Sequence, residues 1–543
     1  MSSSVSPDLT GASRPSEHEL LQREVARRRT FAIISHPDAG KTTLTEKLLL
    51  YAGAIDLAGA VRGRKTQRHA VSDWMQMEQQ RGISISAAAL EFECDGRHVT
   101  LLDTPGHQDF SEDTYRTLLA VDSVVMVLDA AKGIEPQTLK LFEVCRDHGL
   151  PVLTFINKLD QPALDPFELL DQIERVLGIA AAPINWPIGD GHQFAGVFDL
   201  ESHAVLLYER GARGQRTEPI TVSDAADPQL EALVGADRQR RLIEAAEIIG
   251  GAGTRFDEAA YRDARQTAVF FGSALNDFGV EPFLRAILAL APPPRPRGSD
   301  DGPIAPTDPD FSGFVFKVQA NMNPKHRDRV AFVRVCSGRL AKDMAVVNSR
   351  DGAAMRLSRV YRFFGRDRET VPEAYPGDVV GVVNPGRLGI GDTLYAGRPI
   401  RFADVPRFPA ENFAILRPAD MRLKKFDEAV RQLEEEGLMQ VFFPKAGIRH
   451  PIVGVVGPLQ FEVVEARLQA EYGLKCVLDR LPHVAARWPV EAPGAAPVAI
   501  STAETITVED RQGRTVILFE TPWELRYVTE RNPDVRFLAI PER

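Results

Sequence analysis

The segment from residue 35 to residue 43 combines a loop of small residues with lysine and threonine, the residue types that bind phosphate and its metal ion. It reads Ser35-His36-Pro37-Asp38-Ala39-Gly40-Lys41-Thr42-Thr43. Backbone N–H groups of such a loop point at an anion, and a following helix adds partial positive charge. Lys41 then reaches the outer phosphates, and the Thr42 hydroxyl ligates Mg²⁺. The segment predicts a phosphate-binding loop.

The alternative is an ordinary turn, since Ser35 stands where the usual pattern has glycine. The flanking segments favour the phosphate loop. Residues 31–34 are an apolar run that predicts a buried strand, and residues 43–50 predict a helix with Leu44 and Leu48 on its apolar face. A phosphate loop needs this order of strand, loop and helix.

A second motif follows another apolar run and reads Asp103-Thr104-Pro105-Gly106-His107. Asp103 stands where a Walker-B aspartate holds Mg²⁺. Gly106 lets the backbone approach the γ-phosphate. A single histidine is more often a surface or core residue than a catalyst. His107, however, occupies the position at which enzymes with these phosphate-binding motifs orient the attacking water. We therefore expect His107 to be catalytic.

The third motif, Asn157-Lys158-Leu159-Asp160, has a physical reason to recognise guanine. The Asp160 carboxylate can accept from the ring N–H and the exocyclic amine, a donor pair that adenine lacks. Asn157 holds the loop and contacts the base edge, and the stem of Lys158 covers the ring. A later segment, Ser273-Ala274-Leu275, offers the Ala274 N–H to the guanine oxygen. An exposed turn is the alternative, which the two earlier motifs make improbable.

These motifs lie where predicted strands end, and the strands alternate with predicted helices. Such a pattern indicates a parallel sheet covered on both faces, which binds ligands at its carboxyl edge. We expect a lead-in without ordered structure at residues 1–22, a nucleotide-binding domain at 23–292 with an insertion near 184–249, and a Pro-rich linker at 293–310. Short strands then predict a small β-barrel at 311–400, and an α+β sandwich occupies 401–543.

Composition excludes several classes of protein. The 543 residues are 44% hydrophobic and 26% charged, as in a globular protein of several domains. The net charge of -10 argues against a protein that coats nucleic acid without sequence preference. The four cysteines are far apart, so zinc is not supported and a reducing compartment fits. No apolar run reaches the length of a membrane span.

With its three motifs in this order, the chain resembles the translational GTPases. Residues 129–138 are typical of them, and Gln80-Arg81-Gly82-Ile83-Ser84-Ile85 resembles their first switch, with Ser84 in place of threonine. Within that family, residues 424–429 and 433–437 resemble the bacterial class II peptide-chain release factors most. The similarity runs from about residue 28 to the C-terminus. It implies a P-loop GTPase domain with a parallel sheet, a small β-barrel domain and an α+β sandwich domain.

The resemblance also implies GTP and GDP as ligands and Mg²⁺ as the metal ion, with Ser84 joining Thr42 and Asp103 as ligands of that ion. In this family the histidine corresponding to His107 acts only when the ribosome repositions it, and Ile83 either screens it until then or simply packs in the core. The implied partners are the ribosome, with its RNA and proteins, and codon-reading (class I) release factors. Neither DNA nor a membrane is implied. We expect a cytoplasmic monomer.

Three functions stay open at this point. The first is a ribosome-stimulated GTPase that removes a class I release factor after peptide release. The second is another translational GTPase, of the elongation or ribosome-protection type. Such proteins have further domains, and this chain is too short to hold them, which argues against this function. The third is a GTP-gated binding module for a non-ribosomal partner. A basic stretch with Arg356, Arg359, Arg362, Arg366 and Arg368 either contacts ribosomal RNA or forms a solvated strand edge.

Overall fold

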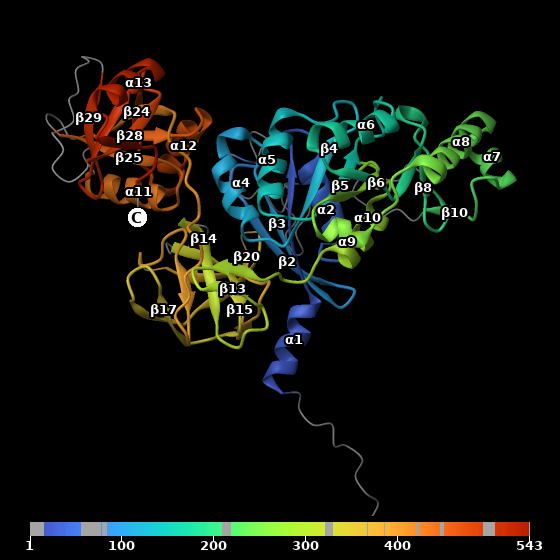
Figure 1. Cartoon of the computed structure of the whole chain (residues 1–543), viewed down its shortest axis with the longest axis horizontal. Helices are drawn as coiled ribbons and strands as arrows, with labels where there is room; N and C mark the ends of the chain where they lie inside the picture. Colours follow the sequence, from blue (N-terminus) through green and yellow to red (C-terminus); the bar gives the residue numbers. More distant parts are fainter. Residues whose placement is uncertain are drawn as a thin grey trace, which may run out of the picture.

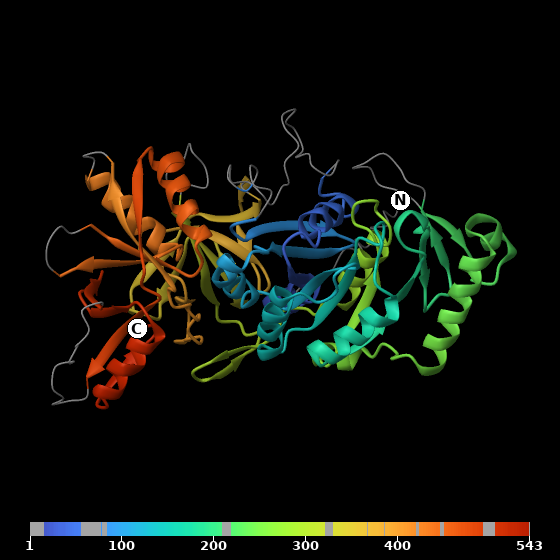
Figure 2. The ribbon, with the colours of Figure 1, turned by 90° about the horizontal axis from the view of Figure 1, so that it is seen from above.

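The computed structural model describes residues 16–55, 78, 84–208, 219–320, 329–365, 367–384, 386–419, 423–445, 450–491 and 505–541. Figure 1 shows a central α/β body, a β-rich body below it and an α+β body to one side. Seen from above (Figure 2), the α+β body and the helix-rich insertion lie at opposite ends of the molecule. The central body corresponds to the predicted nucleotide-binding domain and is called the GTPase domain below, after the family that the sequence resembles. The β-rich body and the α+β body are its two neighbours.

The GTPase domain is built on a mainly parallel sheet with strand order β2-β3-β1-β4-β5-β11-β6, in which only β2 runs antiparallel. Its strands are β1 (Arg28–Ser35), β2 (Ala88–Cys94), β3 (Arg97–Asp103), β4 (Ser123–Asp129), β5 (Val152–Asn157), β6 (Ala180–Pro183) and β11 (Gln266–Phe271). The three predicted motifs follow β1, β3 and β5. Because these strands are parallel, their carboxyl ends meet at one edge.

Helices cover both faces of this sheet, as the apolar strands require. Successive residues of β1 pack into two different cores: Ala32 and Ile34 into one, Phe31 and Ile33 into the other. One core receives side chains from α5 and α6, and the other from α2 and α10. The helices are α2 (Lys41–Tyr51), α4 (Ser111–Leu118), α5 (Pro136–Asp147), α6 (Pro166–Gln172), α9 (Glu258–Arg262) and α10 (Val280–Leu290), with short helical turns η1 (Gln108–Phe110), η2 (Ile173–Leu177) and η3 (Gly191–Gln193).

Between β6 and β11 the chain forms a small subdomain of its own. An antiparallel sheet of order β10-β9-β8-β7 packs beside two helices. The elements are β7 (Asn185–Ile188), β8 (Gly196–Asp199), β9 (Val205–Leu207), β10 (Ile220–Val222), α7 (Pro228–Val234) and α8 (Ala236–Ala252).

The N-terminal segment differs from the expected lead-in. Helix α1 spans Glu17–Arg27, so the last residues of the predicted unstructured segment are helical. Its N-cap is a capping box, in which Ser16 and Glu19 bond each other's backbone N–H groups. Leu21 and Val25 are buried against Tyr375, which lies in the neighbouring β-rich body. This tertiary contact stabilises a helix that is too short to persist alone.

The β-rich body, called the barrel domain below, is an antiparallel sheet of order β18-β17-β23-β14-β15-β22-β19, with β20 on β19 and a separate β16–β21 pair. The strands are β14 (Ser312–Ala320), β15 (Arg329–Ser337), β16 (Leu340–Ala341), β17 (Met344–Asn348), β18 (Ala354–Leu357), β19 (Val360–Phe364), β20 (Asp367–Thr370), β21 (Glu373–Ala374), β22 (Val379–Val383) and β23 (Thr393–Tyr395). The predicted linker before it contains a hairpin of β12 (Arg297–Ser299) and β13 (Gly302–Ile304).

The basic stretch of the barrel domain runs through β18, β19 and β20, and β19 pairs with strands on both of its sides. Tyr361 and Phe363, which interleave with the arginines, are buried in the core. Arg362 pairs with Glu369 at 2.8 Å, and the Arg368 guanidinium lies 4.8 Å from the Tyr361 ring centroid. Arg366 lies outside the described residues. The aromatic side chains are therefore occupied by packing rather than presented for stacking on bases.

The α+β body, called the C-terminal domain below, is an antiparallel sheet of order β27-β24-β26-β25-β29-β30-β28-β31. Phe426, Val430 and Leu433 of helix α11 are buried and form its apolar stripe. The elements are β24 (Asn412–Pro418), α11 (Leu423–Glu435), β25 (Gln440–Pro444), β26 (Ile452–Val455), α12 (Leu459–Tyr472), β27 (Cys476–Leu481), β28 (Ala485–Glu491), β29 (Ile506–Asp510), β30 (Thr515–Phe519), α13 (Pro522–Arg531) and β31 (Val535–Leu538).

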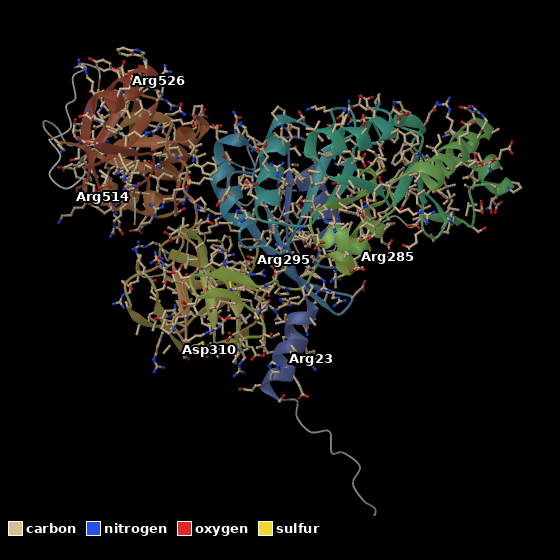
Figure 3. All side chains as sticks on the ribbon, in the orientation of Figure 1. Arg23, Arg285, Arg295, Asp310, Arg514 and Arg526 are labelled. Atoms are coloured by element: carbon tan, nitrogen blue, oxygen red, sulfur yellow. The ribbon has the colours of Figure 1, made fainter. Side chains whose placement is uncertain are left out.

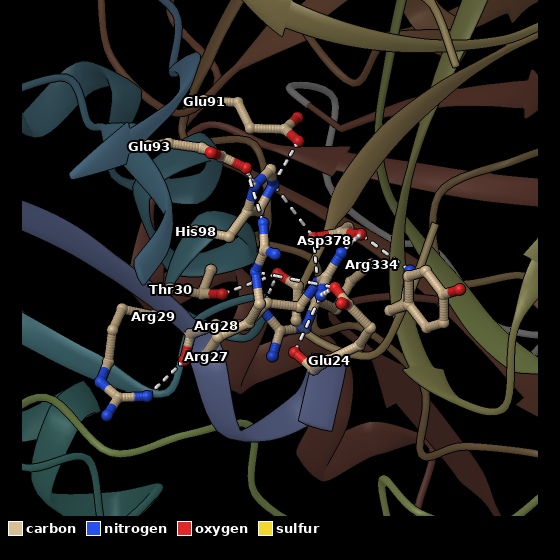
Figure 4. Close-up of polar contacts among 12 residues, drawn as sticks. Glu24, Arg27, Arg28, Arg29, Thr30, Glu91, Glu93, His98, Arg334 and Asp378 are labelled. Carbon is tan, nitrogen blue, oxygen red and sulfur yellow. Dashed lines mark hydrogen bonds and ion pairs between the residues drawn. The ribbon is translucent and has the colours of Figure 1, made fainter. Parts of the chain in front are cut away.

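Buried polar contacts join the GTPase domain to the barrel domain. Arg295, labelled at this junction in Figure 3, donates its N–H to Asp122 Oδ1 at 3.0 Å, and Asp122 Oδ2 accepts from Arg334 at 2.5 Å. A second network (Figure 4) centres on Asp378, whose two oxygens accept from Arg28 at 2.7 and 3.0 Å. Charges that would be costly to bury alone are paired across the interface.

His98 belongs to the second network. Its Nε2 lies 2.6 Å from Glu91 Oε1 and 3.5 Å from Asp378 Oδ1. Among the described residues, Glu91, His98 and Asp378 are the one His/Cys/Asp/Glu group close enough to share a metal ion. Because Arg28 already holds both oxygens of Asp378, an ion network describes the group better than a metal site.

This network predicts a pH-dependent stability. Burial by itself lowers the pKa of His98, but the hydrogen bond to Glu91 and the negative charge of Asp378 outweigh burial and the opposing charge of Arg28, so the pKa is raised. Glu93 Oε1 also faces the ring, 3.6 Å from Nδ1. The stabilisation is complete below the ordinary histidine pKa of about 6.5 and is lost as the pH rises through the higher folded pKa.

We expect the thermal unfolding midpoint of the wild type to fall more than that of His98→Gln between about pH 6 and about pH 9. His18→Gln, a change at an exposed histidine of α1, should follow the wild type. Parallel profiles for the wild type and His98→Gln would contradict this assignment.

Candidate nucleotide-binding and hydrolysis site

A cavity of about 320 Å³ opens at the edge where β1, β3 and β5 end. Most predicted site residues line it, together with Gln161, which the motifs did not indicate. The lining residues are Ser35, His36, Pro37, Asp38, Gly40, Lys41, Thr42, Thr43, Ser84, Gly106, His107, Asn157, Lys158, Asp160, Gln161 and Leu275. The remaining predicted residues, Ala39, Asp103, Thr104, Pro105, Ser273 and Ala274, are buried near this wall.

The loop between β1 and α2 owes its shape to Gly40. Gly40 is the N-cap of α2 and has a φ of 94°, a conformation that side chains disfavour. A Cβ at this position would lie 2.3 Å from Asn157 Nδ2. The free N–H groups of the first turn of α2 therefore face the cavity over a loop that only glycine permits, which is the geometry of an anion site.

Lys41 and Asp103 lie together behind this loop. Lys41 Nζ is 2.5 Å from Asp103 Oδ1, and both side chains are buried. Among the described residues, Asp103 Oδ2 has no hydrogen-bond partner, although it is buried. A buried carboxylate oxygen with spare acceptor capacity suits a hard divalent cation, and Thr42 and Ser84, which line the cavity, add hydroxyl oxygens. The donor set therefore fits Mg²⁺.

Asn157 fastens the two sides of the base-binding end. Its Nδ2 donates to Ala39 O at 2.9 Å, and its Oδ1 accepts from the Ala274 N–H at 2.9 Å. Ala274 thus differs from the expectation, because its N–H is given to Asn157 rather than to a guanine oxygen. Both the oxygen and the nitrogen of the Asn157 amide are hydrogen-bonded within the protein, so Asn157 holds the two loops together.

Asp160 and Lys158 are each fixed by a second residue. Asp160 Oδ1 accepts from the Ser273 hydroxyl at 2.6 Å. Lys158 has a positive φ of 71°, and its ammonium group lies 2.9 Å from Asp129 Oδ2. Asp129 ends β4, and no spacing rule in the sequence links it to Lys158. The sequence signal that could have found Asp129 is its position at the end of a predicted strand, because neighbouring parallel strands bring their carboxyl ends to the same edge.

His107 lies at the phosphate end of the cavity. It caps η1, with Nδ1 accepting from the Asp109 N–H at 3.2 Å. In the neutral ring this places the proton on Nε2. On the other side of the loop, His36 Nε2 is 3.1 Å from Glu135 Oε1. Asp109 and Glu135 are functional neighbours that the motifs did not reveal. Ile83 lies outside the described residues, so its predicted screening role stays a prediction.

Comparisons with known proteins agree with this geometry. Residues 26–293 match the family described as Elongation factor Tu GTP binding domain, and residues 310–397 match Elongation factor G domain 2. Residues 402–529 match Class II release factor RF3, C-terminal domain. Peptide chain release factor 3 of Gloeobacter violaceus is 53% identical over 529 residues, covering 96% of this chain and 98% of that protein. The chain belongs to the peptide chain release factor 3 family.

Other similarities are consistent with that family. Peptide chain release factor 3 of Symbiobacterium thermophilum is 51% identical over 524 residues, covering 96% of this chain and 99% of that protein. A crystal structure of a protein from Thermus thermophilus superposes with a TM-score of 0.67 at 25% identity, over 86% of this chain and 71% of that one.

Membership in the release factor 3 family makes the chain a GTPase of translation termination that binds GTP and GDP. The predicted fold class is confirmed in all three parts. The match of the C-terminal domain distinguishes the chain from elongation-type relatives, which share its first two domains. Within the described residues, every helix is too short or too polar to span a membrane.

Proposed function

We propose that the chain hydrolyses GTP on the ribosome after peptide release and thereby dissociates a class I release factor. The observation that carries this proposal is one cavity that unites a phosphate loop, a guanine-type loop and His107, in a chain of the release factor 3 family. We further propose that it acts as a monomer in the cytoplasm, with ribosomal RNA and proteins as its stimulating surface.

The residues that line the cavity support the proposed roles. Lys41 and the first N–H groups of α2 bind the phosphates, and Asp160 accepts the two guanine donors while Lys158 covers the ring. Thr42, Ser84 and Asp103 hold Mg²⁺, which neutralises phosphate charge when bound. His107 orients the attacking water once the ribosome moves it into line.

The test uses terminated ribosomes that carry a fluorescent class I release factor. With GTP, the chain should raise the dissociation rate of that factor, and Lys41→Ala should not. If the chain pellets with ribosomes in a GTP-dependent way but leaves the rate unchanged, it is another kind of translational GTPase. If it does not pellet with ribosomes in GTP or GDP, it is a binding module for a different partner.

Ser84 provides a test of nucleotide sensing. Ser84→Ala should keep the affinity for GDP and lose roughly tenfold in affinity for GTP with Mg²⁺, because the hydroxyl responds only to the γ-phosphate and the metal ion. Titration calorimetry with each nucleotide measures this, and Ser202→Ala provides the same change at an exposed site. An equal loss for GDP and GTP would assign Ser84 a purely structural role.

A further inference from the structure

Helix α12 of the C-terminal domain packs against η1, the turn that follows His107. Figure 1 shows α12 on the side of its domain that faces the GTPase domain. The Leu459 N–H donates to Asp109 Oδ2 at 2.7 Å, and Asp109 is only 4% exposed. Pro458, the N-cap of α12, makes no side-chain cap of its own. Asp109 therefore caps a helix of another domain, at the end where the helix dipole favours a negative charge.

Gly457 makes this contact close. A Cβ at position 457 would lie 2.1 Å from Asp109 Cγ. The loop is also held within its own domain, because Gln460 Oε1 accepts from the N–H groups of Val456 and Gly457 at 2.8 and 3.0 Å. Any side chain at position 457 must push Asp109 and α12 apart.

Apolar packing extends the same contact. Phe110, next to Asp109, forms a buried cluster with Ile85 from the first switch and Val463 from α12. Leu438 and Leu459 pack against this cluster. The residues directly after the first switch are held by the barrel domain, where Lys317 Nζ donates to Ser86 Oγ and Ala87 O at 2.5 Å each.

The residue that α12 holds is the one that holds His107. The Asp109 N–H donates to His107 Nδ1 at 3.2 Å. The His107 ring is also tilted against Phe110, with centroids 6.1 Å apart. One ring nitrogen is thus committed to Asp109 and is not offered to a water molecule in the cavity.

We propose that Asp109 is a positioning residue through which α12 restrains His107 and slows hydrolysis until the C-terminal domain moves. This rests on the proposed role of His107. When α12 leaves, the Asp109 carboxylate loses its partner and the packing around Phe110, so the η1 turn and the histidine that caps it are free to move. The C-terminal domain then controls the water-orienting group without entering the cavity.

Gly457→Ala tests the proposal from the side opposite the cavity. The φ of Gly457 is not in the left-handed region, so the added methyl acts through its clash with Asp109 rather than through backbone strain. We expect single-turnover GTP hydrolysis by the full chain without ribosomes to rise roughly tenfold, the effect of losing one hydrogen bond to a charged group. The affinity for GTP should stay unchanged.

Three further variants make the result decisive. Gly298→Ala, where a Cβ meets open space, should hydrolyse GTP at the wild-type rate. Gly457→Ala combined with His107→Ala should lose the gain, since the restraint acts through His107. Asp109→Asn, which keeps the acceptor oxygen and loses the charge, should show a smaller gain and serves if Gly457→Ala folds poorly.

A gain that survives in the double variant, or an unchanged or slower rate in both Gly457→Ala and Asp109→Asn, would overturn the proposal. A structural defect alone would lower the rate rather than raise it. Because the assay contains no ribosome and no release factor, its failure is distinguishable from a failure of the termination function.

Discussion

His107→Ala should bind GTP and ribosomes normally and lose roughly 10²–10⁴-fold in ribosome-stimulated hydrolysis, the usual contribution of a positioned group that handles a proton or water. Phosphoryl transfer depends on positioning and charge stabilisation more than on covalent help. No arginine is among the described residues that line the cavity, so the described part of the chain supplies no arginine finger there. Single-turnover hydrolysis with and without terminated ribosomes measures the loss.

The capping role of His107 requires a second variant. His107→Ala also removes the acceptor for the Asp109 N–H, so a local loss of structure must be separated from a loss of chemistry. His107→Asn keeps a cap acceptor and removes the imidazole, because asparagine is a good N-cap residue. Both variants should be equally slow, and His18→Ala should be normal. Full stimulation in His107→Asn would show that the ring is not the water-orienting group.

The slow variant should also remain on the ribosome. The γ-phosphate holds switch segments in place until it is hydrolysed, so a chain that cannot cleave it should enter the complex and leave slowly.

The motifs and the sheet could be predicted because both depend on local sequence. Apolar runs such as residues 31–34 must be buried, and parallel strands bring their carboxyl ends to one edge, so the three motifs had to meet. The pattern of short strands predicted the barrel at 311–400 and the α+β sandwich at 401–543, and the family resemblance then implied the same two domains. Helix α1 was not predicted because the composition of residues 1–22 indicated a segment without ordered structure. Ser16 and Glu19 nevertheless have the spacing of a capping box.

The partners of the site residues could not be predicted, because they come from distant segments. Nothing local links Lys158 to Asp129, Asn157 to the Ala274 N–H, or Asp109 to the Leu459 N–H across 350 positions. Such contacts depend on how loops and domains pack. Such contacts also change the role of a group. The Ala274 N–H, which was expected to donate to the guanine oxygen, donates to Asn157 Oδ1 instead. Motifs therefore identify the chemistry, whereas the structure identifies what restrains it.

Asp160→Asn should lose roughly ten- to hundredfold in affinity for GTP and gain affinity for xanthosine triphosphate, because a hydrogen bond to a charged group is lost. The Ser273 hydroxyl donates to Asp160 Oδ1 at 2.6 Å, so it holds one oxygen and leaves the other for the base. In the variant, Ser273 still favours an oxygen, which turns the new NH₂ group toward the base. Xanthine has a carbonyl where guanine has its amine, so that NH₂ gains an acceptor.

Two matched changes separate base recognition from loop stability. Asp165→Asn makes the same substitution at the N-cap of α6, where asparagine serves equally well, and should leave both affinities unchanged. Ser273→Ala removes the support of Asp160 but not its charge, so it should weaken GTP binding without any gain for the xanthosine nucleotide. Titration calorimetry with both nucleotides decides the matter. If Asp160→Asn binds GTP as the wild type does, the carboxylate does not contact the base, and specificity must arise elsewhere in the cavity.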